Sequence, residues 1–170
     1  MPRSRWAVTV AASIALVLTW LRFTDIADRL VMVALIVGGA YQADSDAQTR
    51  HVSRLVTYAM ASVVVIALLA TSHLWSLVPM VSALVGGGFF LLHLRRKESL
   101  GFGDVLLAPT LALYVGWFDV AAVPAWLIGS SLGAAVTAAV RRHRHVAFAP
   151  WLTLSAVVTI MYVGSQTYSG

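Results

Sequence analysis

The chain has 170 residues, of which 59% are hydrophobic and only 11% are charged, and its mean hydropathy is +0.83. A soluble domain carries about 25% charged residues, because its surface must face water. This chain has too little polar surface to coat a globule, so its natural solvent is lipid. Its formal charge of +5 therefore indicates cytoplasmic loops, and we expect no nucleic-acid partner. The absence of cysteine excludes disulfides, thiol catalysis and thiolate metal sites.

Apolar runs dominate the chain and predict its helices. In chain order they cover Trp6–Leu21, Leu30–Ala43, Leu55–Ala70, Leu74–Leu94, Val105–Phe118, Ala121–Val140 and Ala149–Val163. A helix that crosses a bilayer needs about 20 mainly apolar residues, so the shorter runs must borrow residues from the interface. We expect an all-α transmembrane bundle of about seven helices, or six if one short run does not cross. The whole of residues 1–170 would form one integral-membrane domain, with the first run kept as a helix instead of being removed as a signal peptide.

The basic residues predict the orientation of this bundle. Ten of the twelve lysines and arginines fall before the first helix or in the second-to-third, fourth-to-fifth and sixth-to-seventh connections. In a chain that crosses seven times, all four of these segments lie on one side of the membrane. Basic loops mark the cytoplasmic side, so we expect a cytoplasmic N-terminus and an external C-terminus.

Two of the seven acidic residues stand at the edges of apolar runs on the expected cytoplasmic side. We place Asp46 just before the third helix and Asp104 at the start of the fifth. Those two helices would run in the same direction, so both carboxyl groups are expected near the same membrane face. Two close carboxyl groups share one proton and can act on a water as base and acid. Aspartate at a helix start is also a common N-cap, and Asp44 competes with Asp46 for the same role.

The local sequence around Asp104 distinguishes it from an ordinary helix cap. Residues 100–107 read LGFGDVLL and contain a Gly-x-Gly-Asp motif at the junction between a loop and an apolar run. Because Gly101 and Gly103 have no side chains, a substrate backbone can come close to the aspartate.

Three segments together resemble the type IV prepilin peptidases. Besides the Gly-x-Gly-Asp motif, residues 46–55 read DAQTRHVSRL and resemble the family's D-x-x-T-R-x-I-P-N-x-L stretch. Residues 146–152 read VAFAPWL, follow a basic segment, and are similar to the family's I-P-F-G-P-F-L stretch. The segments occur in the family's order and cover most of the chain from Asp46 onward.

This resemblance implies a membrane-embedded aspartyl endopeptidase of the bacterial cytoplasmic membrane. Such enzymes remove short basic leaders from prepilins or pseudopilins at the cytoplasmic membrane face. By motif match, Asp46 and Asp104 are the expected catalytic pair, and Gly101 and Gly103 are the expected substrate-binding glycines. Water is the nucleophile, so we expect neither a metal nor an organic cofactor. The expected partners are the prepilin or pseudopilin substrate and the lipid bilayer.

The chain also departs from the family pattern. It has Val52-Ser53-Arg54 where members often have Ile-Pro-Asn, and Leu106 where lysine is frequent. The cysteine-rich segment and the methyltransferase portion of larger members are absent, so we expect cleavage without N-methylation. The chain resembles the short, peptidase-only members that serve tight-adherence pili. A non-enzymatic transporter or pilus assembly factor stays open as the alternative, although no acidic residue lies mid-run as a proton relay would require.

Overall fold

The computed structural model describes residues 3–71, 77–95, 101–141 and 147–167, and these residues are helical with no strand. They form seven α-helices and one short 3-10 helix, η2, which confirms the predicted all-α class. The bounds are α1 Arg3–Arg22, α2 Ile26–Thr49, α3 Arg54–Ala70, α4 Val78–Arg95, α5 Phe102–Phe118, η2 Val120–Ala122, α6 Val123–Arg141 and α7 Ala149–Thr167.

Length and composition suit a membrane for part of this bundle. Three described stretches are long and apolar enough to cross a bilayer, namely Ile26–Thr49, Val78–Arg95 and Val120–Val140. The remaining apolar helical stretches in the described ranges are 10–17 residues long, namely Val8–Arg22, Arg54–Ala70, Phe102–Phe118 and Ala149–Gly164. Many of the exposed large side chains are apolar, among them Leu21, Leu55 and Val140, each more than three-quarters exposed. An apolar outer surface of this kind is stable against lipid and unstable against water.

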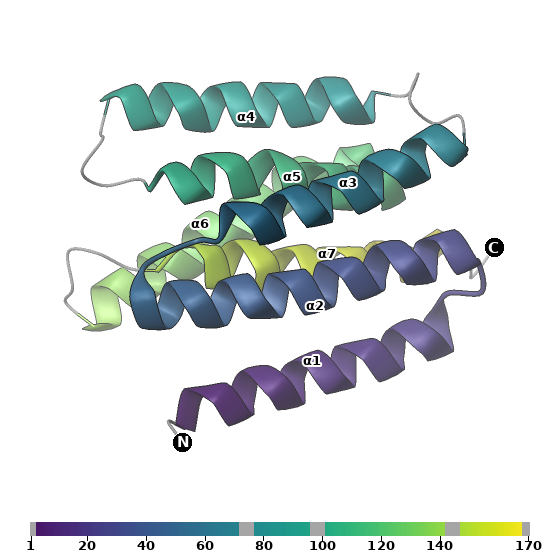
Figure 1. The fold of residues 1–170 in the computed structure, drawn as a ribbon, viewed down its shortest axis with the longest axis horizontal. Helices are drawn as coiled ribbons and strands as arrows, with labels where there is room; N and C mark the ends of the chain where they lie inside the picture. Colours follow the sequence, from purple (N-terminus) through teal and green to yellow (C-terminus); the bar gives the residue numbers. More distant parts are fainter. Residues whose placement is uncertain (1–2, 72–76, 96–100, 142–146, 168–170) are drawn as a thin grey trace.

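The helices lie side by side along the long axis of the molecule and alternate in direction (Figure 1). One end of the bundle therefore gathers the start of α1, the α2–α3 connection, the end of α4, the start of α5, the end of α6 and the start of α7. These are the helix ends that flank the four basic segments of the sequence. The opposite end carries the α1–α2 connection and the end of α7.

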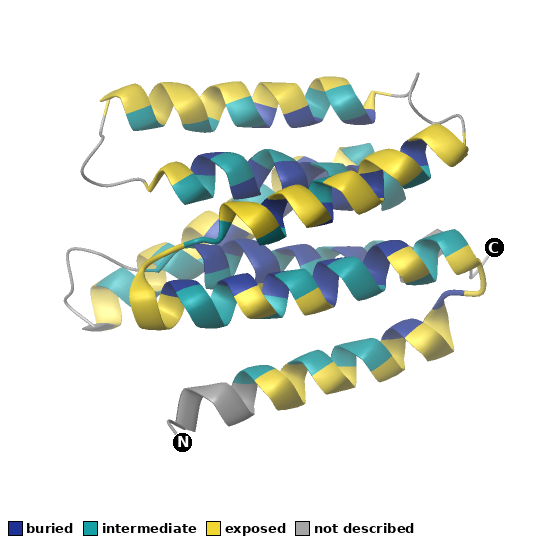
Figure 2. Ribbon diagram, in the orientation of Figure 1, coloured by how far each residue is buried: buried dark blue, intermediate teal, exposed yellow. Residues whose placement is uncertain are grey.

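Helix α5 occupies the centre of the bundle. It packs against α4, α3 and α7. Among the described residues, α5 has more buried positions than any other helix. Helix α7 in turn packs against α2, α5 and α6. Helices α1 and α4 lie at the two edges, and exposed residues cover most of their surfaces (Figure 2).

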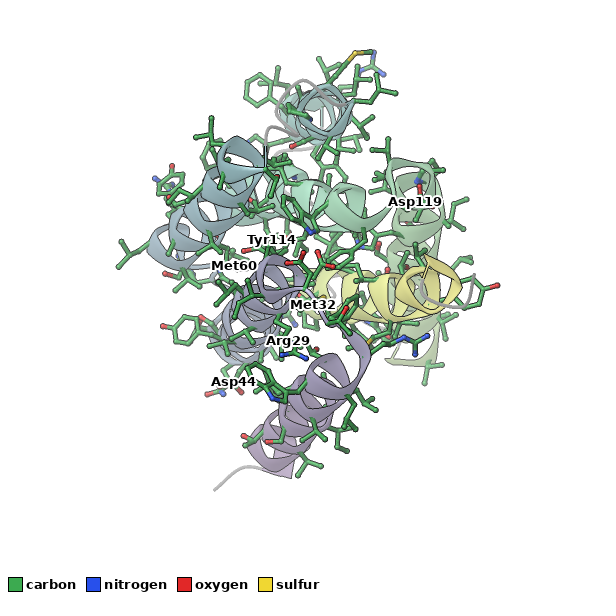
Figure 3. The ribbon with its side chains drawn as sticks, turned by 90° about the vertical axis from the view of Figure 1, so that its right-hand side faces the viewer. Arg29, Met32, Asp44, Met60, Tyr114 and Asp119 are labelled. Atoms are coloured by element: carbon green, nitrogen blue, oxygen red, sulfur yellow. The ribbon has the colours of Figure 1, made fainter. Side chains whose placement is uncertain are left out.

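Polar side chains inside the bundle bond to backbone carbonyls of neighbouring helices. Tyr114 of α5 donates its hydroxyl to the carbonyl oxygen of Met60 in α3 at 2.8 Å, and both residues lie in the interior (Figure 3). Trp126 of α6 donates its indole N–H to the carbonyl oxygen of Leu152 in α7 at 2.9 Å. Such bonds keep buried polar groups satisfied where lipid offers no partner.

Two glycines show how helix packing differs across the bundle. A Cβ on Gly39 of α2 would lie 2.3 Å from the Cγ2 atom of Thr153 in α7, so these helices approach closely only because the side chain is missing. A Cβ on Gly87 of α4 would meet nothing within 4 Å. Packing against α7 therefore requires glycine at position 39, whereas the space around position 87 would accept a larger side chain.

Replacing each glycine with alanine should shift stability in opposite directions. Gly39→Ala should lower the free energy of unfolding by about 1–3 kcal/mol, because the α2–α7 contact is overpacked. Gly87→Ala should raise it by about 0.5–1 kcal/mol, because alanine loses less conformational freedom in a helix. Unfolding titrations in detergent micelles would measure both. Equal effects of the two substitutions would contradict the α2–α7 packing described above.

Candidate functional site

Asp46 lies inside α2 and not in a loop before the third helix, so that part of our sequence-based placement was wrong. The apolar run ends at Ala43, but the helix continues through polar residues to Thr49 and is capped by Arg50. Arg50 takes the left-handed conformation, with φ 56° and ψ 30°, and its N–H donates to the carbonyl oxygen of Asp46 at 3.0 Å. The end of an apolar run marks where polar residues begin, not where a helix must stop. Because α2 and α5 run in opposite directions, the end of α2 and the start of α5 still meet at one end of the bundle.

The carboxylate of Asp46 is buried and held by the start of another helix. Only 7% of the residue is exposed. The backbone N–H of Ala149, the first residue of α7, donates to its Oδ2 atom at 3.1 Å. Asp46 thus supplies the acceptor that an unpaired N–H in the first turn of α7 needs.

Asp104 lies in the first turn of α5, as the sequence predicted. Its backbone N–H donates to the carbonyl oxygen of Gly101 at 3.1 Å. Its Oδ1 atom is buried and has no hydrogen-bond partner within the described ranges. The carboxyl group of Asp104 lies within electrostatic range of Asp46. The fold therefore brings these two carboxyl groups together, although 58 positions separate them in the sequence.

Asp44 occupies a different side of α2. Residues two positions apart on a helix point about 200° away from each other, so Asp44 and Asp46 face in nearly opposite directions. Asp44 accepts a hydrogen bond from the side chain of Gln48 at 2.5 Å and lines a groove between α1 and α2. It lies near the edge of the bundle (Figure 3). The geometry favours Asp46 over Asp44 as the neighbour of Asp104.

The two glycines of the Gly-x-Gly-Asp motif have different surroundings. A Cβ on Gly103 would lie 2.6 Å from the Cβ atom of Val52, so the α2–α3 connection packs directly on the backbone beside Asp104. Gly101 is exposed, and a Cβ there would meet only the Oδ2 atom of Asp104, at 3.6 Å. Gly103 is therefore required for packing, whereas the space around Gly101 opens toward the Asp104 carboxyl group.

A buried glutamine that the sequence did not single out lies one helical turn before Asp46. Gln42 is fully buried, and its Oε1 atom accepts from the N–H of Ser53 at 2.8 Å. Its Nε2 atom donates to the carbonyl oxygen of Ser53 and to the hydroxyl of Thr57, each at 2.7 Å. A polar residue inside an apolar run was the signal available in the sequence, because such a residue needs buried partners.

The donor groups near the site do not suit a metal ion. Within the part of the chain that the structure describes, no group of three or more histidine, aspartate or glutamate side chains is arranged to hold one. The basic segment beginning at Arg141, which includes His143 and His145, lies almost wholly outside the described residues.

Comparison with known proteins assigns the chain to a family. Neither the curated proteins nor the solved structures include a significant match. The model of the type IV leader peptidase family matches residues 32–139, which is well over half of the chain and includes both Asp46 and Asp104. This chain therefore belongs to the type IV leader peptidase family.

Proposed function

We propose that this protein is a membrane-embedded aspartyl endopeptidase that uses Asp46 and Asp104 as its catalytic pair. It cleaves the short basic leader from a prepilin or pseudopilin at the cytoplasmic membrane face. The observation that carries the proposal is that the end of α2 and the start of α5 place Asp46 and Asp104 at the same end of the bundle, in a chain of this family. The Gly-x-Gly-Asp motif, which places Asp104 in the first turn of α5, supports the same assignment.

The surroundings of the two carboxyl groups suggest how they divide the work. Asp46 accepts a hydrogen bond from the N–H of Ala149, and such a bond favours an ionised carboxylate. Asp104 has a buried oxygen without a partner in the described residues, which suits the member that carries the shared proton. Asp46 then removes a proton from water as the water attacks the scissile carbonyl carbon. Asp104 donates its proton to the carbonyl oxygen, which gives a gem-diol intermediate. When the C–N bond breaks, the leaving amine takes the proton held by Asp46, and a hydroxyl of the gem-diol returns a proton to Asp104.

The orientation of the bundle supports the proposed location of the reaction. Both aspartates lie at the end that gathers the basic helix connections (Figure 1). Under the positive-inside rule this end faces the cytoplasm, in a multi-pass protein of the bacterial inner membrane. A basic leader would be attracted to the acidic pair, whereas the arginine-rich connections keep the protein against anionic lipid.

Removing either carboxyl group should abolish cleavage. Asp46→Asn and Asp104→Asn keep the size of the side chain but cannot ionise, so each should lower the cleavage rate by about 100-fold or more. The assay is co-expression with a candidate prepilin from the same genome, with the shortened product followed on gels. Asp44→Asn is the matched control, because it makes the same change two residues away on the opposite side of α2, and it should leave cleavage unchanged.

Three results would count against this assignment. If Asp44→Asn abolishes cleavage while Asp46→Asn does not, the wrong member of the pair has been chosen. If both single variants still cut, the carboxyl groups are not the catalytic pair. If the wild-type protein is inserted in the membrane but cuts no co-encoded prepilin, the alternative of a non-enzymatic transporter or assembly factor takes precedence.

Alanine substitutions at the two motif glycines should have different effects, one on folding and the other on substrate binding. Gly103→Ala forces the α2–α3 connection away from α5, so it should lower both the unfolding free energy, by about 1–3 kcal/mol, and the activity. Gly101→Ala adds only an ordinary contact near Asp104, so it should leave stability within about 0.5 kcal/mol while raising KM for the substrate. Detergent unfolding and initial-rate kinetics on the same preparations test both. An unchanged KM for Gly101→Ala would remove Gly101 from the substrate-binding surface.

A further inference from the structure

We infer that Gln42 is a positioning residue, which fixes the α2–α3 connection against α5 and thereby sets the spacing between Asp46 and Asp104. The hydrogen bonds of Gln42 go to Ser53 and Thr57 and to neither carboxyl group. It acts through Ser53, Val52 and Gly103. Its effect on cleavage rests on the proposed function, whereas its effect on structure does not.

The first step is the pairing of Gln42 with the start of α3. Both polar atoms of the amide have partners: its oxygen accepts from the N–H of Ser53, and its nitrogen donates to Ser53 and to Thr57. The bonds to both the N–H and the C=O of Ser53 fix this one peptide segment in two directions. The amide is fully buried, so breaking these bonds leaves buried polar groups without partners.

The second step carries this constraint to both aspartates. Gln42 and Asp46 are four residues apart, so they lie on the same face of α2, one turn from each other. Ser53 is next to Val52, whose side chain rests on the backbone of Gly103. Gly103 precedes Asp104, whose own N–H is bonded to Gly101. The contact between α2 and the first turn of α5 therefore passes through the segment that Gln42 holds.

The backbone conformation of Ser53 indicates why the α2–α3 connection needs the restraint that Gln42 supplies. Ser53 has a φ of −73°, which is within the range that a proline ring imposes. The related stretch of the prepilin peptidases often has proline at this position, whereas this chain has a serine that retains its N–H. Proline restricts the connection covalently and offers no N–H to bond. In this chain, the hydrogen bonds from Gln42 of α2 restrict the backbone of the same connection.

Hydrogen exchange tests the structural part of the inference without any assay of cleavage. Gln42→Leu keeps the volume of the side chain but removes all three hydrogen bonds. The amides of Ser53 and Asp104 should both exchange faster by about 10-fold or more in this variant. The matched control is Gln48→Leu, the same substitution at an exposed position on α2, which should change neither. Unchanged exchange at Asp104 in Gln42→Leu would overturn the inference, even if Ser53 exchanges faster.

Kinetics and a second substitution test the consequence for the catalytic pair. Gln42→Leu should lower kcat by about 10- to 100-fold with little change in KM, because the reacting groups are displaced. It should also move the limbs of the pH–rate profile, since the coupling of two carboxyl groups depends on their spacing. Loss of folded protein alone would scale the profile without moving it. Adding Ser53→Pro to Gln42→Leu should restore most of kcat.

The outcomes separate this inference from the proposed function. If the wild-type protein cuts no prepilin, the proposed function fails, and the exchange of the Asp104 amide still decides whether Gln42 positions the segment. If the wild-type protein cuts and Gln42→Leu keeps both its kcat and its pH profile, the inference fails and the proposed function stands. If Ser53→Pro gives no rescue in the Gln42→Leu background, restriction of the α2–α3 connection is not what Gln42 provides, and the inference fails as well.

Discussion

The buried carboxylate of Asp46 accepts a backbone hydrogen bond at the start of α7, and the arrangement of that end of the bundle depends on this contact. A buried carboxylate needs hydrogen-bond donors, and the N–H of Ala149 supplies one from a helix terminus that itself needs an acceptor. The same carboxylate acts electrostatically on Asp104 at the start of α5. The hydrogen bond joins α2 to α7, whereas two negative charges repel each other, so the packing of the surrounding helices must hold α2 and α5 together at this polar point.

The rest of the molecule holds these three helices at fixed positions. Lipid provides little hydrophobic drive for helix association, so close packing and interhelical hydrogen bonds must supply it. Gly39 brings α2 against α7, and Gly103 brings the α2–α3 connection against α5. The hydroxyl of Tyr114 fastens α5 to α3 in the middle of the bundle. Each of these contacts lies between helices that carry or support one of the two aspartates, so packing and the chemistry of the site depend on the same residues.

The sequence predicted the features that composition and short motifs record directly. Long apolar runs indicated the helices, the distribution of arginine and lysine indicated which helix ends lie together, and the Gly-x-Gly-Asp motif placed Asp104 in the first turn of a helix. The position of Asp46 was wrong because α2 extends six residues beyond its apolar run, through Asp44 to Thr49. Apolarity reports the surroundings of a helix, whereas its end depends on capping by Arg50, which takes an uncommon left-handed conformation.

Other parts of the site leave little trace in a single sequence. The donor to Asp46 is the backbone N–H of Ala149, and no side chain marks it. The partners of Gln42 lie 11 and 15 positions along the chain, and two of its three bonds are to backbone atoms. The reason for glycine at position 103 is contact with Val52, a residue 51 positions earlier. These are tertiary contacts, which periodicity and local motifs do not encode.

Proximity of the two carboxyl positions is the central claim, and cysteine cross-linking tests it most directly. The chain has no cysteine of its own, so each introduced pair is the only one present. The pair Asp46→Cys with Asp104→Cys should be joined in membranes by a short bifunctional thiol reagent, as seen on gels after cutting the chain between α3 and α4. The pair Asp44→Cys with Asp104→Cys should stay unlinked. Cross-linking of the second pair in preference to the first would contradict the site described here.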